Sequence, residues 1–281
     1  MNKELESLIL NAGDLPTIPV VATKVMELVE NPNATADEIA KVIASDPAVA
    51  ARVLKISNSS FYGCQRQIQT LSHAIMVLGF SVLKSLVIAA SVKQVCKRFG
   101  LIENMLWEHS FGAGLAARII ARHTRAVNEE EAFLGGLFHD IGKSIMNSMD
   151  SQKFQSVIEI SFNNGIPFSD AERQVYPFSH SEVGAAVVKK WNFPDMLMYA
   201  VARHHSLAFG EEDDPYLVRL ACVVALANMF CHHAGIGMRE PEEVVFTDFE
   251  PATRLGLDQE DVGWLLEAFS EAYERDKTFF S

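Results

Sequence analysis

The sequence predicts an all-α protein. Apolar residues recur at helical spacing along most of its 281 residues, and helix caps and breakers separate these segments at short intervals. Alternating strand patterns are almost absent, and strands do not alternate with helices along the chain. We therefore expect a multi-helical bundle of about ten or more helices.

The N-terminal part carries several helix-boundary signals. Thr35 and Glu38 form the T-x-x-E pattern of a capping box, and Asp46 stands before Pro47 as an N-cap stands before a first helical proline. A Thr/Ser cap opens a short helix that we expect to end at Gly79, and a longer buried helix follows it.

The rest of the chain is expected to be helical between short breakers. The stretch FLGGLFHDIGKS is mostly apolar, so we interpret it as one core helix whose glycines let neighbouring helices approach closely. The expected helices cover residues 104–123, 133–144, 151–163, 179–193, 194–206, 213–235 and 258–276. The stretch FGLIEN (99–104) is the best boundary, and it divides an N-terminal helical lobe (1–100) from a larger lobe (101–281).

Charge and composition exclude several classes of function. The net charge of −12 repels a phosphate backbone, so we expect no nucleic-acid partner. No apolar window reaches the roughly 18 residues of a membrane span, and the N-terminus lacks a signal-peptide pattern. Four cysteines without a CxxC pair indicate reduced thiols (Cys64, Cys96, Cys222 and Cys231). These features predict a cytoplasmic protein with no membrane partner.

Polar residues in apolar segments suggest a metal site. Imidazoles and a carboxylate would be costly to bury without partners, and together they suit Fe, Mn or Zn better than Ca or Mg. Lys143 follows the acid closely enough to contact a phosphate group or to donate a proton. The candidate ligands from this reasoning are His109, His139, Asp140, His180, His204 and His205.

Structural explanations compete with this hypothesis. An adjacent His-Asp pair is often a satisfied structural pair, and Lys143 could complement a helix dipole. The glycines at 135, 136 and 142 match no phosphate-binding loop, so close packing explains them better. The number of histidines at helix ends favours the site.

Several motifs resemble the HDOD family, whose members are bacterial signalling and regulatory modules related to HD-type metal phosphohydrolases. The matching stretches run over about residues 14–210. They read LPTIPVVATKVMEL, VIASDPAVAARVLKISNSSFYG, TLSHAIMVLG, LWEHSFGAGLAARIIA, GLFHDIGK, HSEVGAAVVKKWNFP and ARHHS. The resemblance implies an all-α, HD-like helical bundle and a role in signal transduction.

The resemblance also implies which residues would form the site. The chain keeps the positions that bind metal in HD-GYP phosphodiesterases, but it lacks their GYP signature after His205. Asn228 stands where the superfamily has a final metal-binding aspartate, so Asp140 is the only carboxylate of the set. Two divalent cations would then keep a net positive charge, which weakens the site or favours one metal or a bound anion.

We therefore expect a signalling module that binds one or two divalent transition metals, with weak or no hydrolase activity. One alternative is an active metal-dependent phosphohydrolase acting on a nucleotide or cyclic dinucleotide, with Asp140 and Lys143 as its catalytic residues. Another alternative is a metal-free protein-interaction scaffold. The expected partners are a signalling protein, whose identity the sequence leaves open, and a phosphate-containing ligand.

Overall fold

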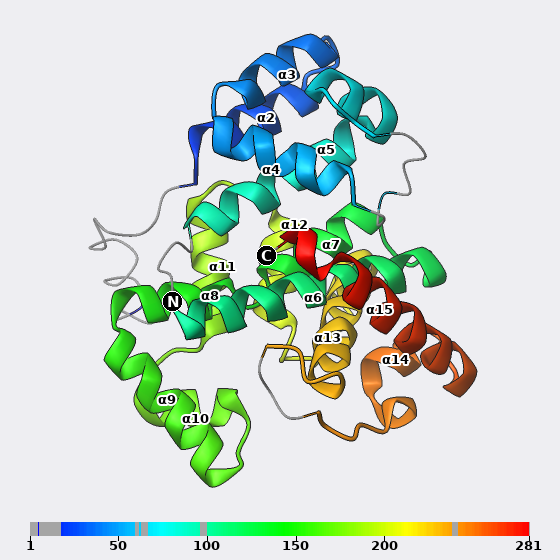
Figure 1. Ribbon diagram of the computed structural model, residues 1–281. Coiled ribbons are helices and arrows are strands. Elements are labelled where there is room, and N and C mark those ends of the chain that lie inside the picture. The colour runs from blue at the N-terminus through cyan, green and yellow to red at the C-terminus, as the bar shows by residue number, and fades with distance from the viewer. Residues whose placement is uncertain are drawn as a thin grey trace. The chain divides into compact units, whose positions relative to one another are not determined.

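The computed structural model describes residues 5, 18–59, 62, 67–95, 100–237 and 241–280. Within these residues every regular element is a helix, so the all-α prediction is confirmed (Figure 1). By compactness the chain divides into two units. The larger unit comprises Met1–Pro16 and Arg98–Leu265, and the smaller comprises Thr17–Lys97 and Leu266–Ser281. The proposed division into lobes 1–100 and 101–281 stays a prediction.

The smaller unit shows how local sequence sets helix boundaries. Its helices before residue 97 are α2 (Val20–Glu30), α3 (Ala36–Ala44), α4 (Pro47–Ser57) and α5 (Leu71–Val95). Thr35 and Glu38 form the expected capping box of α3, and the Asp46 side chain accepts hydrogen bonds from two backbone N–H groups of α4. Gly79 has a φ of 83°, which breaks α5 into two helical segments where the short helix was expected to end.

The larger unit is built around buried helices. Its elements are α6 (Leu101–Thr124), α7 (Glu129–Phe138), α8 (Ile141–Met149), α9 (Ser151–Asn164), α10 (Phe168–Val175), α11 (His180–Lys190), α12 (Asp195–Arg203), α13 (Pro215–His233), the 3-10 turn η2 (Phe246–Asp248) and α14 (Glu250–Arg254). Helix α15 (Gln259–Phe280) begins in this unit. Helix α6 packs against α7 and α13, α11 packs against α8 and α12, and α9 lies beside α10 (Figure 1).

The expected single helix over 133–144 is wrong. Helix α7 ends at Phe138 and α8 begins at Ile141, so His139 and Asp140 form the junction between two helices. Next to this junction the chain meets another helix. A Cβ atom on Gly142 would lie 1.9 Å from the carbonyl oxygen of His180, so the first turn of α8 packs directly on the first turn of α11.

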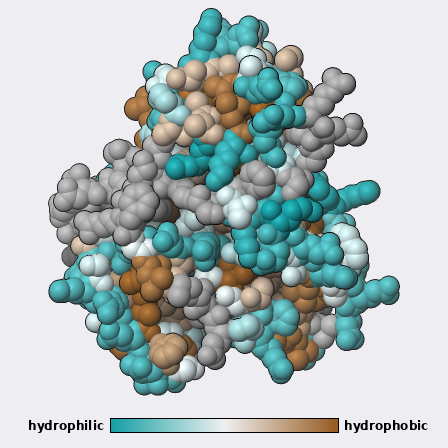
Figure 2. Space-filling model, in the orientation of Figure 1, coloured by the Kyte–Doolittle hydropathy of each residue, from teal (hydrophilic) through white to brown (hydrophobic). Residues whose placement is uncertain are grey.

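Burial supports the expectation of core thiols and core helices. Cys222 and Cys231 are buried free thiols, whereas Cys64 and Cys96 lie outside the described residues. Contrary to the expectation that no apolar window reaches the length of a membrane span, two helical stretches, Leu71–Val92 and Pro215–His233, are long and apolar enough to cross a membrane, and 56% and 61% of their apolar windows are buried. Such burial is typical of core helices. The coloured surface in Figure 2 is mostly hydrophilic, with apolar side chains in separate groups.

Candidate metal centre

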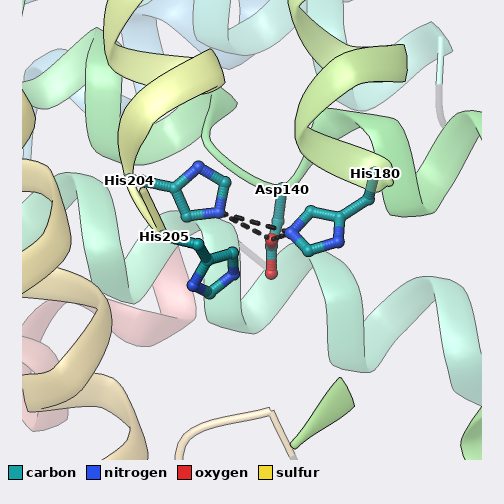
Figure 3. Close-up of side chains that lie close together, drawn as sticks. All are labelled: Asp140, His180, His204 and His205. Atoms are coloured by element: carbon teal, nitrogen blue, oxygen red, sulfur yellow. Dashed lines mark hydrogen bonds and ion pairs between the residues drawn. The ribbon is translucent and has the colours of Figure 1, made fainter. Parts of the chain in front are cut away.

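All eight residues singled out in the sequence lie in the larger unit and gather around Asp140. They are His109 from α6, His139 and Asp140 from the α7–α8 junction, Lys143 from α8, His180 from α11, His204 and His205 from the end of α12, and Asn228 from α13. Figure 3 shows the Asp140 carboxylate between His180 and His204, with His205 beside them. The structure thus brings the predicted residues together, and metal binding by them stays a prediction.

Asp140 is the centre of the cluster. Its side chain is 2% exposed, and its Oδ1 lies 3.3 Å from His180 Nε2 and 3.7 Å from His204 Nε2. Its Oδ2 lies 3.4 Å from His139 Nε2 and 3.7 Å from His109 Nε2. Each carboxylate oxygen therefore faces two imidazole nitrogens from different segments of the chain.

Two of these imidazoles are held by backbone carbonyls. The Nδ1 of His139 lies 2.6 Å from the Gly136 oxygen, and the Nδ1 of His204 lies 2.7 Å from the Val201 oxygen. A carbonyl only accepts, so each Nδ1 carries the proton that it donates. In a neutral imidazole this leaves a lone pair on Nε2, the atom that faces Asp140.

His180 is held by a carboxylate that the sequence analysis missed. Its Nδ1 lies 2.9 Å from Glu172 Oε2, and its backbone N–H donates to Glu172 Oε1 at 2.8 Å. Glu172 is fully buried in α10. The sequence did carry a signal, because Glu172 shares the helical stripe of Phe168, Ala171 and Val175, where an apolar residue is expected.

His109 stands between two oxygen atoms. Its Nδ1 lies 3.3 Å from the Ile236 carbonyl oxygen, and its Nε2 lies 2.9 Å from Asn228 Oδ1. A neutral imidazole has one N–H, so it can satisfy only one of these acceptors. A cation between Nε2 and the amide oxygen would satisfy the other, which makes Asn228 a candidate ligand.

Lys143 closes one side of the cluster. Its Nζ donates to Asp140 Oδ2 at 2.7 Å and lies 4.7 Å from the centre of the Phe168 ring. The Lys143 side chain is 12% exposed, so its charge is only partly screened by water. A phosphate group approaching this edge would meet an ammonium that is already oriented.

Electrostatics keep the acid ionised and two imidazoles neutral. Burial lowers the pKa of His109 and of His204 to about 3. Burial also opposes ionisation of Asp140, but the neighbouring His139 ring and the Lys143 ammonium outweigh it and hold the pKa of that carboxyl well below its usual value. Neutral imidazoles around a carboxylate are the protonation states that metal ligands need.

The pKa values of His180 and His205 shift in opposite directions. Burial and the Lys143 charge act against protonation of His180, yet the nearby carboxylates of Asp140 and Glu172 outweigh them and raise its pKa. The atoms packed around the His205 ring lower its pKa by partly desolvating it, and the neighbouring histidines add to this effect. His205 is nevertheless the solvent-exposed member of the cluster, so the site opens to water on its side.

The donor set fits a transition metal. Asp140, His180, His204 and His205 form one group and His109, His139 and Asp140 form another, and the candidate ligand atoms of each group lie within 4.8 Å of one another. Among the described residues, His139 Nε2 and Asp140 Oδ1 are buried without a hydrogen-bond partner. These atoms carry lone pairs that face one another with no proton between them. A cation bound among them would stabilise this arrangement. Several nitrogens with one carboxylate favour Fe, Mn or Zn over Ca or Mg.

Comparisons with known proteins agree with this architecture. The HDOD domain model matches residues 15–207. A protein of Treponema pallidum (strain Nichols) is 25% identical over 217 residues, which is 77% of this chain and 42% of that protein. The chain therefore spans less than half the length of this curated relative.

Two solved structures are similar in fold. An HDOD domain protein of unknown function from Geobacter sulfurreducens has a TM-score of 0.83 and 24% identity, over 97% of this chain and 95% of that one. A protein from Shewanella amazonensis SB2B, described as a candidate phosphohydrolase, has a TM-score of 0.73 and 22% identity, over 97% and 98% of the two chains. At these identities the likeness establishes the all-α fold.

Proposed function

Because the chain belongs to the HDOD family, we propose that it is a bacterial signal-transduction module with an HD-type metal site and with weak or no hydrolase activity. It works in the cytoplasm, binds one or two ions of Fe, Mn or Zn, and regulates a signalling protein. The observation that carries the metal site is the convergence of four imidazole Nε2 atoms on Asp140, each within 3.7 Å.

The residues that would hold the metal are Asp140, the five histidines of the cluster and the amide oxygen of Asn228. A bound divalent ion supplies Lewis acidity and lowers the pKa of a bound water. The chain's own groups orient the ligands, exclude water from the buried side and place the Lys143 ammonium beside Asp140. That ammonium is the group that would bind a phosphate-containing ligand.

Weak or absent turnover follows from the charge of the ligand set. Asp140 is its only carboxylate, and Asn228 contributes a neutral oxygen. Neutral ligands neutralise a metal poorly, so the site favours one ion, or an added anion that completes it. A tightly held anion that is not cleaved suits a sensor better than an enzyme.

The test is the metal content of protein purified without a His-tag. We expect Fe, Mn or Zn above background in the wild type and its loss in His139→Ala. Metal should raise the melting temperature of the stripped protein, because a ligand of the folded state alone stabilises that state. No metal in the wild type and no thermal shift on loading would support the metal-free scaffold instead.

A phosphohydrolase is the second candidate, and the Lys143–Asp140 pair, in which Nζ lies 2.7 Å from Oδ2, favours it. In that case Lys143 would neutralise charge that develops on the phosphate, and Asp140 would orient the attacking group. The assay is turnover of nucleotides, cyclic dinucleotides and a generic phosphodiester with added Mn²⁺ or Fe²⁺. Turnover that is lost in Lys143→Met would favour the enzyme over the sensor.

A further inference from the structure

The functions considered so far give Glu172 no role, although its buried position needs an explanation. Its side chain is fully buried, and a buried carboxylate is costly unless its charge and its lone pairs are matched. Among the described residues its one ion-pair partner is His180, at 2.9 Å. The carboxylate must therefore interact with the cluster through this imidazole.

The two oxygens of Glu172 hold two different parts of His180. Oε1 accepts the backbone N–H, which is one of the unpaired donors at the start of α11, and Oε2 accepts Nδ1–H. The backbone and the ring are thus fixed by the same group. The ring then directs Nε2 toward Asp140 Oδ1 and toward His204 Nε2, each 3.3 Å away.

The position of His180 in its helix explains why a carboxylate is needed. The rings of His139 and His204 use the carbonyl three residues earlier, which the helix before each of them supplies. His180 is the first residue of α11 and follows the non-helical stretch Tyr176–Ser179. No preceding helical turn offers a carbonyl there, and α10 supplies Glu172 in its place.

We infer that Glu172 is a positioning residue that fixes the tautomer and direction of His180, so that Nε2 serves as a metal ligand. The metal half of this inference rests on the proposed function. A carboxylate behind a ligating imidazole also makes that imidazole a better donor, and losing such a partner typically lowers metal affinity about 10–100-fold. Glutamine has the same shape as Glu172, but it can accept only one of the two hydrogen bonds.

The experiment compares Glu172→Gln with Glu182→Gln. Glu182 also lies at the start of α11, where it is exposed and completes a capping box with Ser179. Glu182→Gln removes a carboxylate charge at the same helix start, keeps an oxygen that can complete the capping box, and leaves the ring of His180 untouched. Each variant and the wild type are measured in two ways, by ¹⁵N NMR of the histidine rings in metal-free protein and by calorimetric titration with Mn²⁺ and Zn²⁺.

We expect the wild-type ring of His180 to carry a hydrogen-bonded proton on Nδ1. In Glu172→Gln this proton signal should move or disappear, and metal affinity should fall about 10–100-fold. In Glu182→Gln both readouts should stay at their wild-type values. An unprotonated Nδ1 in the wild type would overturn the inference even if the variant failed to fold, and so would equal losses of affinity in the two variants.

The two readouts separate this inference from the proposed function. If the wild type binds neither metal, the metal site fails, while the metal-free NMR spectra still decide whether Glu172 fixes the ring. If the wild type binds metal and the Glu172→Gln spectrum and affinity are unchanged, the site stands and the role of Glu172 is rejected.

Discussion

The two ligand groups that share Asp140 differ in the residues beside their imidazoles and in their exposure to solvent. On the His180 side a buried carboxylate, Glu172, stands behind one imidazole, and the exposed His205 leads to solvent. On the His109 side the second oxygen comes from a neutral amide, Asn228, and every ligand is buried. The His180 side therefore has more negative charge, and a metal ion can reach it from solvent more easily.

This difference predicts the order in which the two sides of the cluster bind metal ions. Negatively charged groups near a site lower the free energy of a bound cation, and water access lets the ion enter and shed its hydration shell. The first ion should bind beside His180. A second ion beside His109 would share only Asp140 as a source of negative charge, so it should bind more weakly.

Asp140→Asn gives the largest expected effect, because it removes the group that both sides share. Metal binding should be lost on both sides. The metal-free protein should lose about 3 kcal/mol of unfolding free energy, because Lys143 keeps its charge without its buried partner. Metal analysis and urea unfolding measure the two effects.

Asp150→Asn is the matched control for that experiment. Asp150 caps the start of α9, and asparagine caps helices about as well as aspartate, so this variant should leave both the stability and the metal content close to their wild-type values. Wild-type metal content in Asp140→Asn would contradict the shared ligand and, with it, the comparison of the two sides.

The sequence predicts which residues form the cluster far better than it predicts which groups hold their side chains in place. The chemistry of imidazole and carboxylate groups, together with the family motifs, identifies eight residues that the structure brings together in this cluster. The carbonyls of Gly136 and Val201 that hold two of the rings carry no side-chain signal, because any residue has a carbonyl. Glu172 is marked in the sequence only by its place on the apolar stripe of α10, and its partner is found only when α10 folds against the start of α11.

Helix boundaries, too, can be predicted where neighbouring residues set them but not where a tertiary contact is involved. The capping box at Thr35 and the break at Gly79 arise from neighbouring residues, and the sequence predicts both. The break at His139 and Asp140 lies inside an apolar run with no local stop signal. It accompanies the packing of Gly142 on the His180 backbone, which is a tertiary contact that periodicity cannot detect.

Asn228→Asp should make the two sides more alike, with an effect of intermediate size. The new carboxylate would lie near His109 Nε2, where the amide oxygen is now 2.9 Å away. With metal, affinity on that side should rise at least about tenfold, which is about 1.4 kcal/mol. Without metal, a second buried carboxylate near Asp140 should destabilise the fold by about 2 kcal/mol.

The thermal shift on metal loading is the test of Asn228→Asp. The stripped variant should melt below the stripped wild type, but its melting temperature should rise more on Mn²⁺ loading than that of the wild type does. A rise on loading that is no larger than in the wild type would mean that residue 228 affects packing alone, and that the His109 side holds no ion.

His205→Ala should have the smallest effect, although His205 belongs to the stronger side. Among the described residues no hydrogen bond holds its ring, which rests against His204 with centroids 4.1 Å apart. An imidazole that must be ordered on binding contributes less than one already held, because its rotamer freedom is lost at that moment. We expect less than about a tenfold loss of metal affinity in His205→Ala, against more than about 100-fold in His180→Ala. Equal losses in calorimetric titrations would show that the number of ligands, and not the groups that hold them, sets the affinity of this site.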